Sequence, residues 1–171
     1  MIKDEINPNM CWINKKARTD AIYVDKALKY FYNIGSDVKI LYVYLNGKGN
    51  YNRQTVLNEI IRNKKQSSAD NQVVVYVIDT DNLQDSNVVK ENGKITKFCN
   101  NKNFDLVWMC ENVEEVFLNK TVADKQKVSS AKCFAVKTGL DKANELSLSA
   151  VQIRNKKSNL LLIFDQYLER I

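Results

Sequence analysis

The run of residues 73–78 constrains the fold of this chain most strongly. Its residues are apolar and mostly β-branched, with no alternation, whereas a strand with one solvated face alternates apolar and polar residues. A continuous run is typical of a strand covered on both faces, as in the parallel sheets of α/β proteins. The run leads directly into Asp79 and Asp81. Because ligands of open α/β sheets bind outside the carboxyl ends of strands, these two carboxylates are the first candidate site residues.

The spacing of Asp79 and Asp81 allows two interpretations. In an extended chain, residues i and i+2 point to the same side, so both carboxylates would be available to one divalent cation such as Mg²⁺, which prefers oxygen ligands. The alternative is that both are solvated loop acids or helix caps. The pair alone does not decide between a metal site and this structural role.

Strand-like and helix-like patterns alternate along the chain. Predicted strands lie at residues 10–14, 38–45, 73–78 and 94–99, and helical spacing is found at residues 19–32, around 56–61, over 103–118 and in a closing helix at 160–168. Such alternation favours βαβ units, and 171 residues fit one domain. We therefore expect residues 1–171 to form a single α/β domain with a mostly parallel, Rossmann-like sheet of about four strands flanked by helices.

The composition restricts the chemistry. The chain has no histidine, which excludes Ser-His and Cys-His nucleophilic sites and histidine-ligated metals. Its net charge of +6 permits an anionic partner such as nucleic acid. No apolar run approaches the roughly 18–20 residues that span a bilayer, so no membrane partner is expected. The first five residues are mostly charged and contain no signal-peptide core, which predicts a cytoplasmic protein.

Basic residues follow two of the predicted strands. Lys15, Lys16 and Arg18 come directly after the first strand, at the edge where the aspartates should lie, and either hold phosphate or form a solvated loop. Lys48 lies between two glycines in the loop at residues 46–50. That loop either cradles a phosphate or is an ordinary strand-to-helix turn, since it lacks the P-loop spacing.

A second notable stretch begins near residue 100. We expect a helix that starts near residue 103, with an asparagine at position 101 or 103 as its cap and Asp105 in its first turn. Glu111, Glu114 and Glu115 would lie further along that helix, on its solvated face rather than as metal ligands.

Together these residues resemble a known family. The aspartate pair and residues 101–108 are similar to the D-x-D and N-P-x-F-E-x-W signatures of RloB-like proteins, an abortive-infection family related to Toprim domains, and the resemblance covers most of the chain. Two further residues, Thr19 and Asp20, are similar to the family's E-G-x-x-T-E segment after the first strand. The residues of the second signature that match are Asn101, Phe104 and Trp108, with Asp105 in place of the glutamate.

The resemblance implies a function and a set of site residues. Such proteins are implicated in phage-defence and restriction-linked loci, often beside an ATPase, and their Toprim relationship implies an Mg²⁺-dependent nuclease. Asp79 and Asp81 would hold the metal, with Asp105 as a further catalytic residue in its outer shell. The residues that would hold the phosphate backbone are Lys15, Lys16, Arg18 and Lys48.

One departure from the family pattern bears on catalysis. Lys15 stands where the first-strand glutamate is expected, and an ammonium cannot bind Mg²⁺. Either Asp20 substitutes in a shifted register, or the chain is a divergent member that acts as a non-catalytic nucleic-acid-binding or partner-binding module of an ATPase-associated complex. We expect residues 14–20, Asp79 and Asp81 to lie at one sheet edge, with the Lys15 ammonium balancing the aspartates and residues 101–105 beginning their helix beside them.

Overall fold

The computed structural model describes residues 10–15, 18–36, 38–67, 71–136, 140 and 142–171. Of residues 10–15, 18, 142 and 143 only the backbone is described. The expected phosphate contacts of Lys15 and Arg18 depend on side chains that lie outside the described part of the chain, and Lys16 lies wholly outside it.

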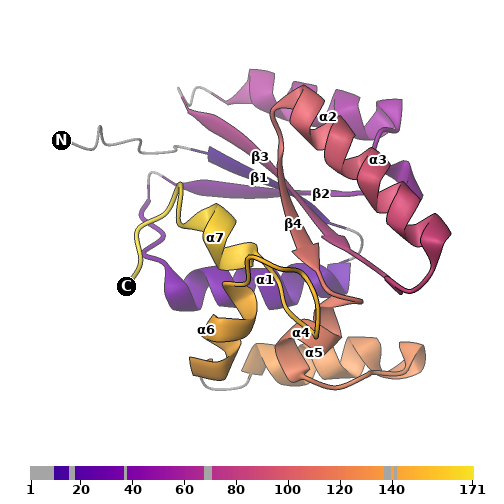
Figure 1. Cartoon of the computed structure of the whole chain (residues 1–171). Coiled ribbons are helices and arrows are strands. Elements are labelled where there is room, and N and C mark those ends of the chain that lie inside the picture. Colours follow the sequence, from indigo (N-terminus) through magenta and orange to yellow (C-terminus); the bar gives the residue numbers. More distant parts are fainter. Residues whose placement is uncertain (1–9, 16–17, 37, 68–70, 137–139, 141) are drawn as a thin grey trace.

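Within the described residues, four parallel strands form one sheet in the order β2-β1-β3-β4. The strands are β1 (Met10–Lys15), β2 (Lys39–Tyr44), β3 (Gln72–Asp79) and β4 (Asp105–Met109). Figure 1 shows helices on both faces of this sheet. The predicted mixed α/β fold, with a parallel sheet flanked by helices, is confirmed.

Two helices cover one face and the others cover the opposite face (Figure 1). The first pair is α2 (Gln54–Gln66) and α3 (Ser86–Lys102). The second group consists of α1 (Arg18–Phe31), α4 (Val113–Leu118), α5 (Lys127–Val136), α6 (Lys142–Leu148) and α7 (Leu160–Phe164). Two short 3-10 turns, η1 (Lys48–Asn50) and η2 (Asp124–Gln126), precede α2 and α5.

The central strand β3 explains why the sheet is covered twice. Val74, Tyr76 and Ile78 belong to the hydrophobic cluster that includes residues of α2 and α3. The side chains between them, Val75 and Val77, belong to the cluster formed with α1, α4, α5 and α7. Because successive side chains of a strand point to opposite faces, an unbroken apolar run supplies both cores.

Two predicted elements were wrong. Residues 94–99, expected as a strand, lie inside α3, whose buried residues Asn92, Ile95 and Cys99 have helical spacing. The helix expected from residue 103 is instead the strand β4, followed by the short helix α4. Asn103 adopts the left-handed conformation and ends α3 as its C-cap, with φ 53°, so it terminates a helix rather than starting one.

The C-terminal segment docks against the end of α1. Arg170 forms an ion pair with Asp165 and lies over the ring of Tyr32 at 5.1 Å. The Tyr32 hydroxyl lies 2.9 Å from the Asp165 carboxylate.

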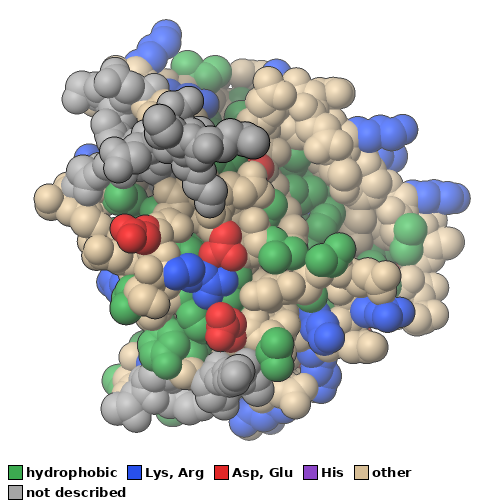
Figure 2. All heavy atoms as spheres, turned by 60° about the vertical axis from the view of Figure 1, so that its left-hand side comes forward, with side chains coloured by type: hydrophobic (Ala, Val, Ile, Leu, Met, Phe, Trp, Pro, Cys, Tyr) green, Lys and Arg blue, Asp and Glu red, His purple; other side chains and the backbone are tan. Residues whose placement is uncertain are grey.

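Figure 2 views the molecule from the side on which the C-terminus lies in Figure 1 and shows acidic and basic side chains next to each other near its centre. Within the described part of the chain, no helix is long and apolar enough to cross a membrane.

Candidate functional site

The carboxyl ends of β1 and β3 form the switch point of the sheet. The chain passes from β1 to β2 on one side, and β3 lies on the other side of β1. Lys15, the last residue of β1, pairs with Val77 of β3, two residues before Asp79. The expectation that the end of the first strand and Asp79 lie at one sheet edge is therefore confirmed for the backbone. In open α/β sheets, ligands bind at such a position.

The residues after β3 are held by the residues after β4. Thr80 is 3 % exposed; its amide donates to the carbonyl of Met109 at 2.8 Å, and its hydroxyl accepts from the amide of Glu111 at 2.8 Å. The amide of Asp81 donates to the carbonyl of Glu111 at 3.1 Å. Both of these acidic residues have positive φ, 56° for Asp81 and 61° for Glu111. These three hydrogen bonds thus tie the two strand ends together.

This backbone geometry changes the relation between Asp79 and Asp81. The i, i+2 rule for a shared side applies to extended chains, and a φ of 56° takes Asp81 out of the extended region. Their exposures also differ, because Asp79 is 5 % exposed and the Asp81 side chain is 43 % exposed. The i, i+2 spacing of Asp79 and Asp81 is therefore no longer an argument that both carboxylates face the same ion.

A buried lysine balances the charge of Asp81. The Lys48 side chain is 6 % exposed, and its ammonium lies 3.0 Å from Oδ2 of Asp81. The same ammonium donates to the carbonyl of Thr80 at 2.9 Å, which also accepts from the side-chain amide of Asn92 at 3.0 Å. The lysine expected in this role was Lys15, whose side chain is not described. Sequence reasoning missed Lys48 as the partner, although a lysine between glycines after a strand was the available signal.

The loop that carries Lys48 has the geometry of a strand-to-helix turn. Gly47 has φ 122°, a conformation that favours glycine. The side-chain amide of Asn50 donates to the carbonyls of Leu45 at 3.0 Å and Asn46 at 2.9 Å. Because its ammonium is engaged with Thr80 and Asp81, Lys48 is directed into the protein rather than toward a phosphate in solvent.

Glu111 joins Asp81 in a hollow of about 280 Å³. The other residues that line it are Asn82, Asn112 and Lys127. The sequence analysis placed Glu111 on the solvated face of a helix, but it lies in the connection between β4 and α4. Among the described residues, no three His, Cys, Asp or Glu side chains are grouped so that they could hold one metal ion. A largely hydrated Mg²⁺ binds through one or two carboxylates, and Asp81 and Glu111 are the pair suited to that.

Asp105 lies at the opposite end of the sheet from Asp79, which corrects its predicted role beside the aspartates. It pairs with Val75, whereas Asp79 pairs with Met109, so four residues of strand, about 13 Å, separate the two positions. Oδ2 of Asp105 accepts a hydrogen bond from the Tyr167 hydroxyl at 2.6 Å. Asp105 thus ties β4 to the C-terminal segment.

The other residues of the second signature have structural contacts. Asn101 is exposed in the last turn of α3. The Phe104 ring stacks on Tyr76 with centroids 5.6 Å apart, and the Trp108 amide donates to Asn159 at 2.8 Å. Residues 101–105 therefore end a helix and start a strand, and do not begin a helix beside the aspartates as expected.

Thr19 and Asp20 lie in the first turn of α1, directly after β1. Their position at the carboxyl edge of the sheet agrees with the expectation for residues 14–20. The Thr19 hydroxyl donates to the Asp20 carboxylate at 3.4 Å.

The acids of α4 are buried, so their predicted place on a solvated face was wrong. Glu114 is 2 % and Glu115 is 3 % exposed. Glu115 accepts from the Thr121 hydroxyl at 2.8 Å and pairs with Lys156 at 3.6 Å.

Burial, together with the charge of Glu114, raises the pKa of Tyr23 well above its usual value. The Tyr23 hydroxyl has no hydrogen-bond partner among the described residues.

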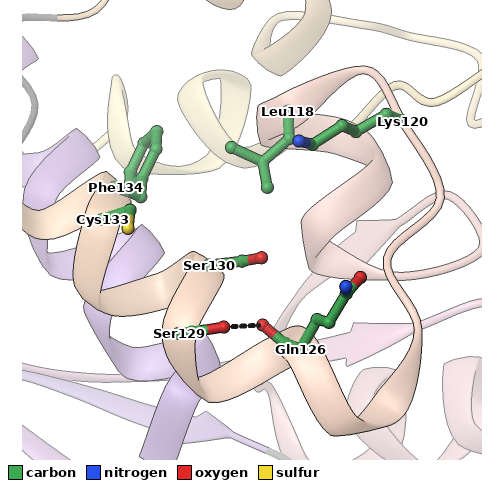
Figure 3. Close-up of a pocket in the computed structure, with 7 residues that line it drawn as sticks. All are labelled: Leu118, Lys120, Gln126, Ser129, Ser130, Cys133 and Phe134. Atoms are coloured by element: carbon green, nitrogen blue, oxygen red, sulfur yellow. Dashed lines mark hydrogen bonds between the residues drawn. The ribbon is translucent and has the colours of Figure 1, made fainter.

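A separate hollow of about 420 Å³ lies beside α5 (Figure 3). It shares no lining residue with the hollow at Asp81 and contains no carboxylate. In Figure 3 the side chains of Ser130 and Gln126 point into the space between α5 and the end of α4. Its lining residues are Leu118, Lys120, Gln126, Ser129, Ser130, Cys133 and Phe134.

No protein-family model, curated protein or solved structure matches the chain.

Proposed function

We propose that the carboxyl edge of the sheet binds nucleic acid and that its acidic site is catalytically degenerate. One observation carries this proposal: the Lys48 ammonium lies 3.0 Å from Asp81 and is almost completely buried. An internal cation thus neutralises the carboxylate that would otherwise attract Mg²⁺. With this charge balanced, the net charge of +6 favours an anionic partner over a divalent cation.

A divergent RloB-like, Toprim-related identity fits this proposal. The adjacency of β1 and β3 and the position of Asp79 at the end of β3 support it. Lys15 in place of the family's glutamate and Asp105 at the opposite end of the sheet support loss of catalysis. The resemblance further suggests a role in phage defence, as a binding subunit that works with a partner ATPase.

The second candidate function is an Mg²⁺-dependent phosphodiesterase. It is favoured by the hollow that Asp81 and Glu111 line together, because two carboxylates suffice for a hydrated Mg²⁺. A bound Mg²⁺ would stabilise negative charge on a scissile phosphate. Asp81 and Glu111 would hold the ion, and Lys127, in the same hollow, would orient a phosphate oxygen.

The two candidates differ in their dependence on metal. We expect a fluorescent single-stranded oligonucleotide to bind equally well in EDTA and in Mg²⁺, with no cleavage of DNA or RNA and no heat of Mg²⁺ binding in calorimetry. Mg²⁺-dependent cleavage that is lost in Glu111→Gln and retained in Lys132→Gln, an exposed position on α5, would establish the phosphodiesterase instead. A protein that binds no oligonucleotide under either condition would refute both candidates.

A further inference from the structure

A hollow of about 440 Å³ lies between the loop after β2 and the exposed side of α3. Its volume is within the range of sites that hold small organic ligands, about 300–1,000 Å³. Of its residues, only Gly49 belongs to a segment that the sequence singled out as a candidate binding site, the loop at residues 46–50. It is lined by Gly49, Tyr51, Asn52, Asn87, Lys90, Glu91 and Lys94.

Two exposed lysines give the hollow its positive charge. Lys90 and Lys94 are both exposed and lie four residues apart on α3, which places them on one side of the helix, about 6 Å apart along its axis. Within the described part of the chain, neither forms an ion pair, so both ammonium groups are available to a ligand. Two ammonium groups at this spacing are suited to phosphate groups of one chain.

The remaining side chains suit a nucleobase better than a second phosphate. Glu91 is the one acid among the residues that line the hollow, and a carboxylate accepts hydrogen bonds from exocyclic amines of bases. Asn52 and Asn87 add amide donors and acceptors. The ring of Tyr51 packs edge-on against Phe98 at 5.2 Å, which fixes its position as one wall.

The hollow adjoins the candidate site through the backbone. Gly49 directly follows Lys48, and Glu91 directly precedes Asn92. Lys48 and Asn92 both donate to the carbonyl of Thr80, the residue before Asp81. The backbone around the hollow is therefore connected to the carboxyl edge of the sheet through the hydrogen bonds of Lys48 and Asn92.

We propose that this hollow seats one nucleotide unit of a single-stranded nucleic acid, with Lys90 and Lys94 on the two phosphates that flank it and Glu91 at the edge of its base. The inference rests on the proposed nucleic-acid-binding function and names where the strand lies. The volume of the hollow suits a single nucleotide and not a duplex, and a base that is unpaired presents the hydrogen-bonding edge that Glu91 would contact.

The decisive variant is the double substitution Lys90→Gln/Lys94→Gln. Its matched control is Lys125→Gln/Lys132→Gln, which removes the same charge from exposed positions in η2 and α5. Binding of labelled single-stranded oligonucleotides is measured by fluorescence anisotropy over a range of salt concentrations. Loss of two phosphate contacts should reduce the slope of log K against log salt by about 1.4 and weaken binding about tenfold at low salt. The control should keep the wild-type slope.

A second variant tests the base contact. Glu91→Ala should reduce the preference for oligo-dC over oligo-dT, because thymine lacks an exocyclic amine, while the salt slope stays unchanged. Circular dichroism checks that each variant is folded.

The outcomes separate this inference from the proposed function. If the wild-type protein binds oligonucleotides and the α3 variant behaves like its control, the hollow is not the binding site, although the function stands. If the wild-type protein binds none, both fall. Duplex DNA bound as tightly as single strands, or a mononucleotide bound as tightly as the oligonucleotide, would overturn the proposed single-stranded ligand.

Discussion

The ion pair between Lys48 and Asp81 should respond unequally to removal of its two partners. The Lys48 side chain is 6 % exposed, whereas that of Asp81 is 43 % exposed. In Lys48→Met, water can solvate the Asp81 carboxylate, and the carbonyl of Thr80 keeps its bond from Asn92. In Asp81→Asn, a buried ammonium keeps only neutral partners. Asp81→Asn should therefore lower the free energy of unfolding more than Lys48→Met does.

The magnitudes follow from these exposures. Lys48→Met removes hydrogen bonds of a charged donor but leaves no buried group unsatisfied, so we expect a loss of about 1–2 kcal/mol in the free energy of unfolding. Removing one partner of a fully buried pair costs about 3–5 kcal/mol, and solvent screening at the half-exposed Asp81 reduces this to about 2–3 kcal/mol. Asparagine tolerates the positive φ of Asp81, so the substitution changes mainly the charge.

Urea unfolding followed by circular dichroism measures both losses, provided that the m-value stays constant. The double variant Lys48→Met/Asp81→Asn should lose less than the sum of the single variants, because the buried ammonium is absent from it. Two results would refute the reasoning: an Asp81→Asn variant that is as stable as Lys48→Met or more so, or strictly additive losses, which would show that the two groups do not interact.

Three further predictions concern the rest of the fold. Gly93 lies inside α3 with no atom within 4 Å of an added Cβ, so Gly93→Ala should stabilise the protein by about 0.5–1 kcal/mol in urea unfolding; a loss would indicate a turn there. Although burial raises the pKa of Asp165, its hydrogen bonds, chiefly that from Arg170, bring the pKa below the usual 3.8. The stability that Asp165 contributes is thus present at neutral pH and is lost as the pH falls below about 4. Asp165→Asn should be less stable than the wild-type protein at pH 7 and should lose less stability on acidification, as urea midpoints at pH 7 and below pH 4 would show. Asp105→Ala should cost about 1 kcal/mol through the lost hydrogen bond from Tyr167 and leave oligonucleotide binding unchanged in anisotropy titrations; weakened binding would contradict a nucleic-acid site at the carboxyl edge of the sheet.

The central strand and its position could be read from the sequence because both depend on local patterns. An unbroken apolar run from residue 73 to residue 78 has no solvated face, so it required cover on both sides, and β3 has it. The position of Asp79 at the carboxyl end of that strand followed directly. The alternation of strands and helices was enough to predict a parallel sheet.

The secondary structure of short apolar stretches without a clear period was predicted wrongly. Residues 94–99 contain apolar residues that suit a strand or one side of a helix, and periodicity over so few residues does not distinguish the two. The helix α3 also continues through Gly93, although glycine is more common in turns than inside helices. For the same reason residues 105–109 were predicted as part of a helix, although they form the strand β4. Asp105 was therefore expected beside the aspartates, whereas it lies at the amino end of β4.

The sequence by itself thus determined the α/β class, the doubly covered strand and the aspartates at its end, because each depends on neighbouring residues. Only the tertiary structure decided which charges meet at that edge. Lys48 and Asp81 are 33 residues apart, and their contact depends on the strand order and on the left-handed backbone of Asp81. The hollow beside α3 likewise exists only where the loop after β2 packs next to that helix. Contacts of this kind are set by the packing of whole elements, which no local pattern encodes.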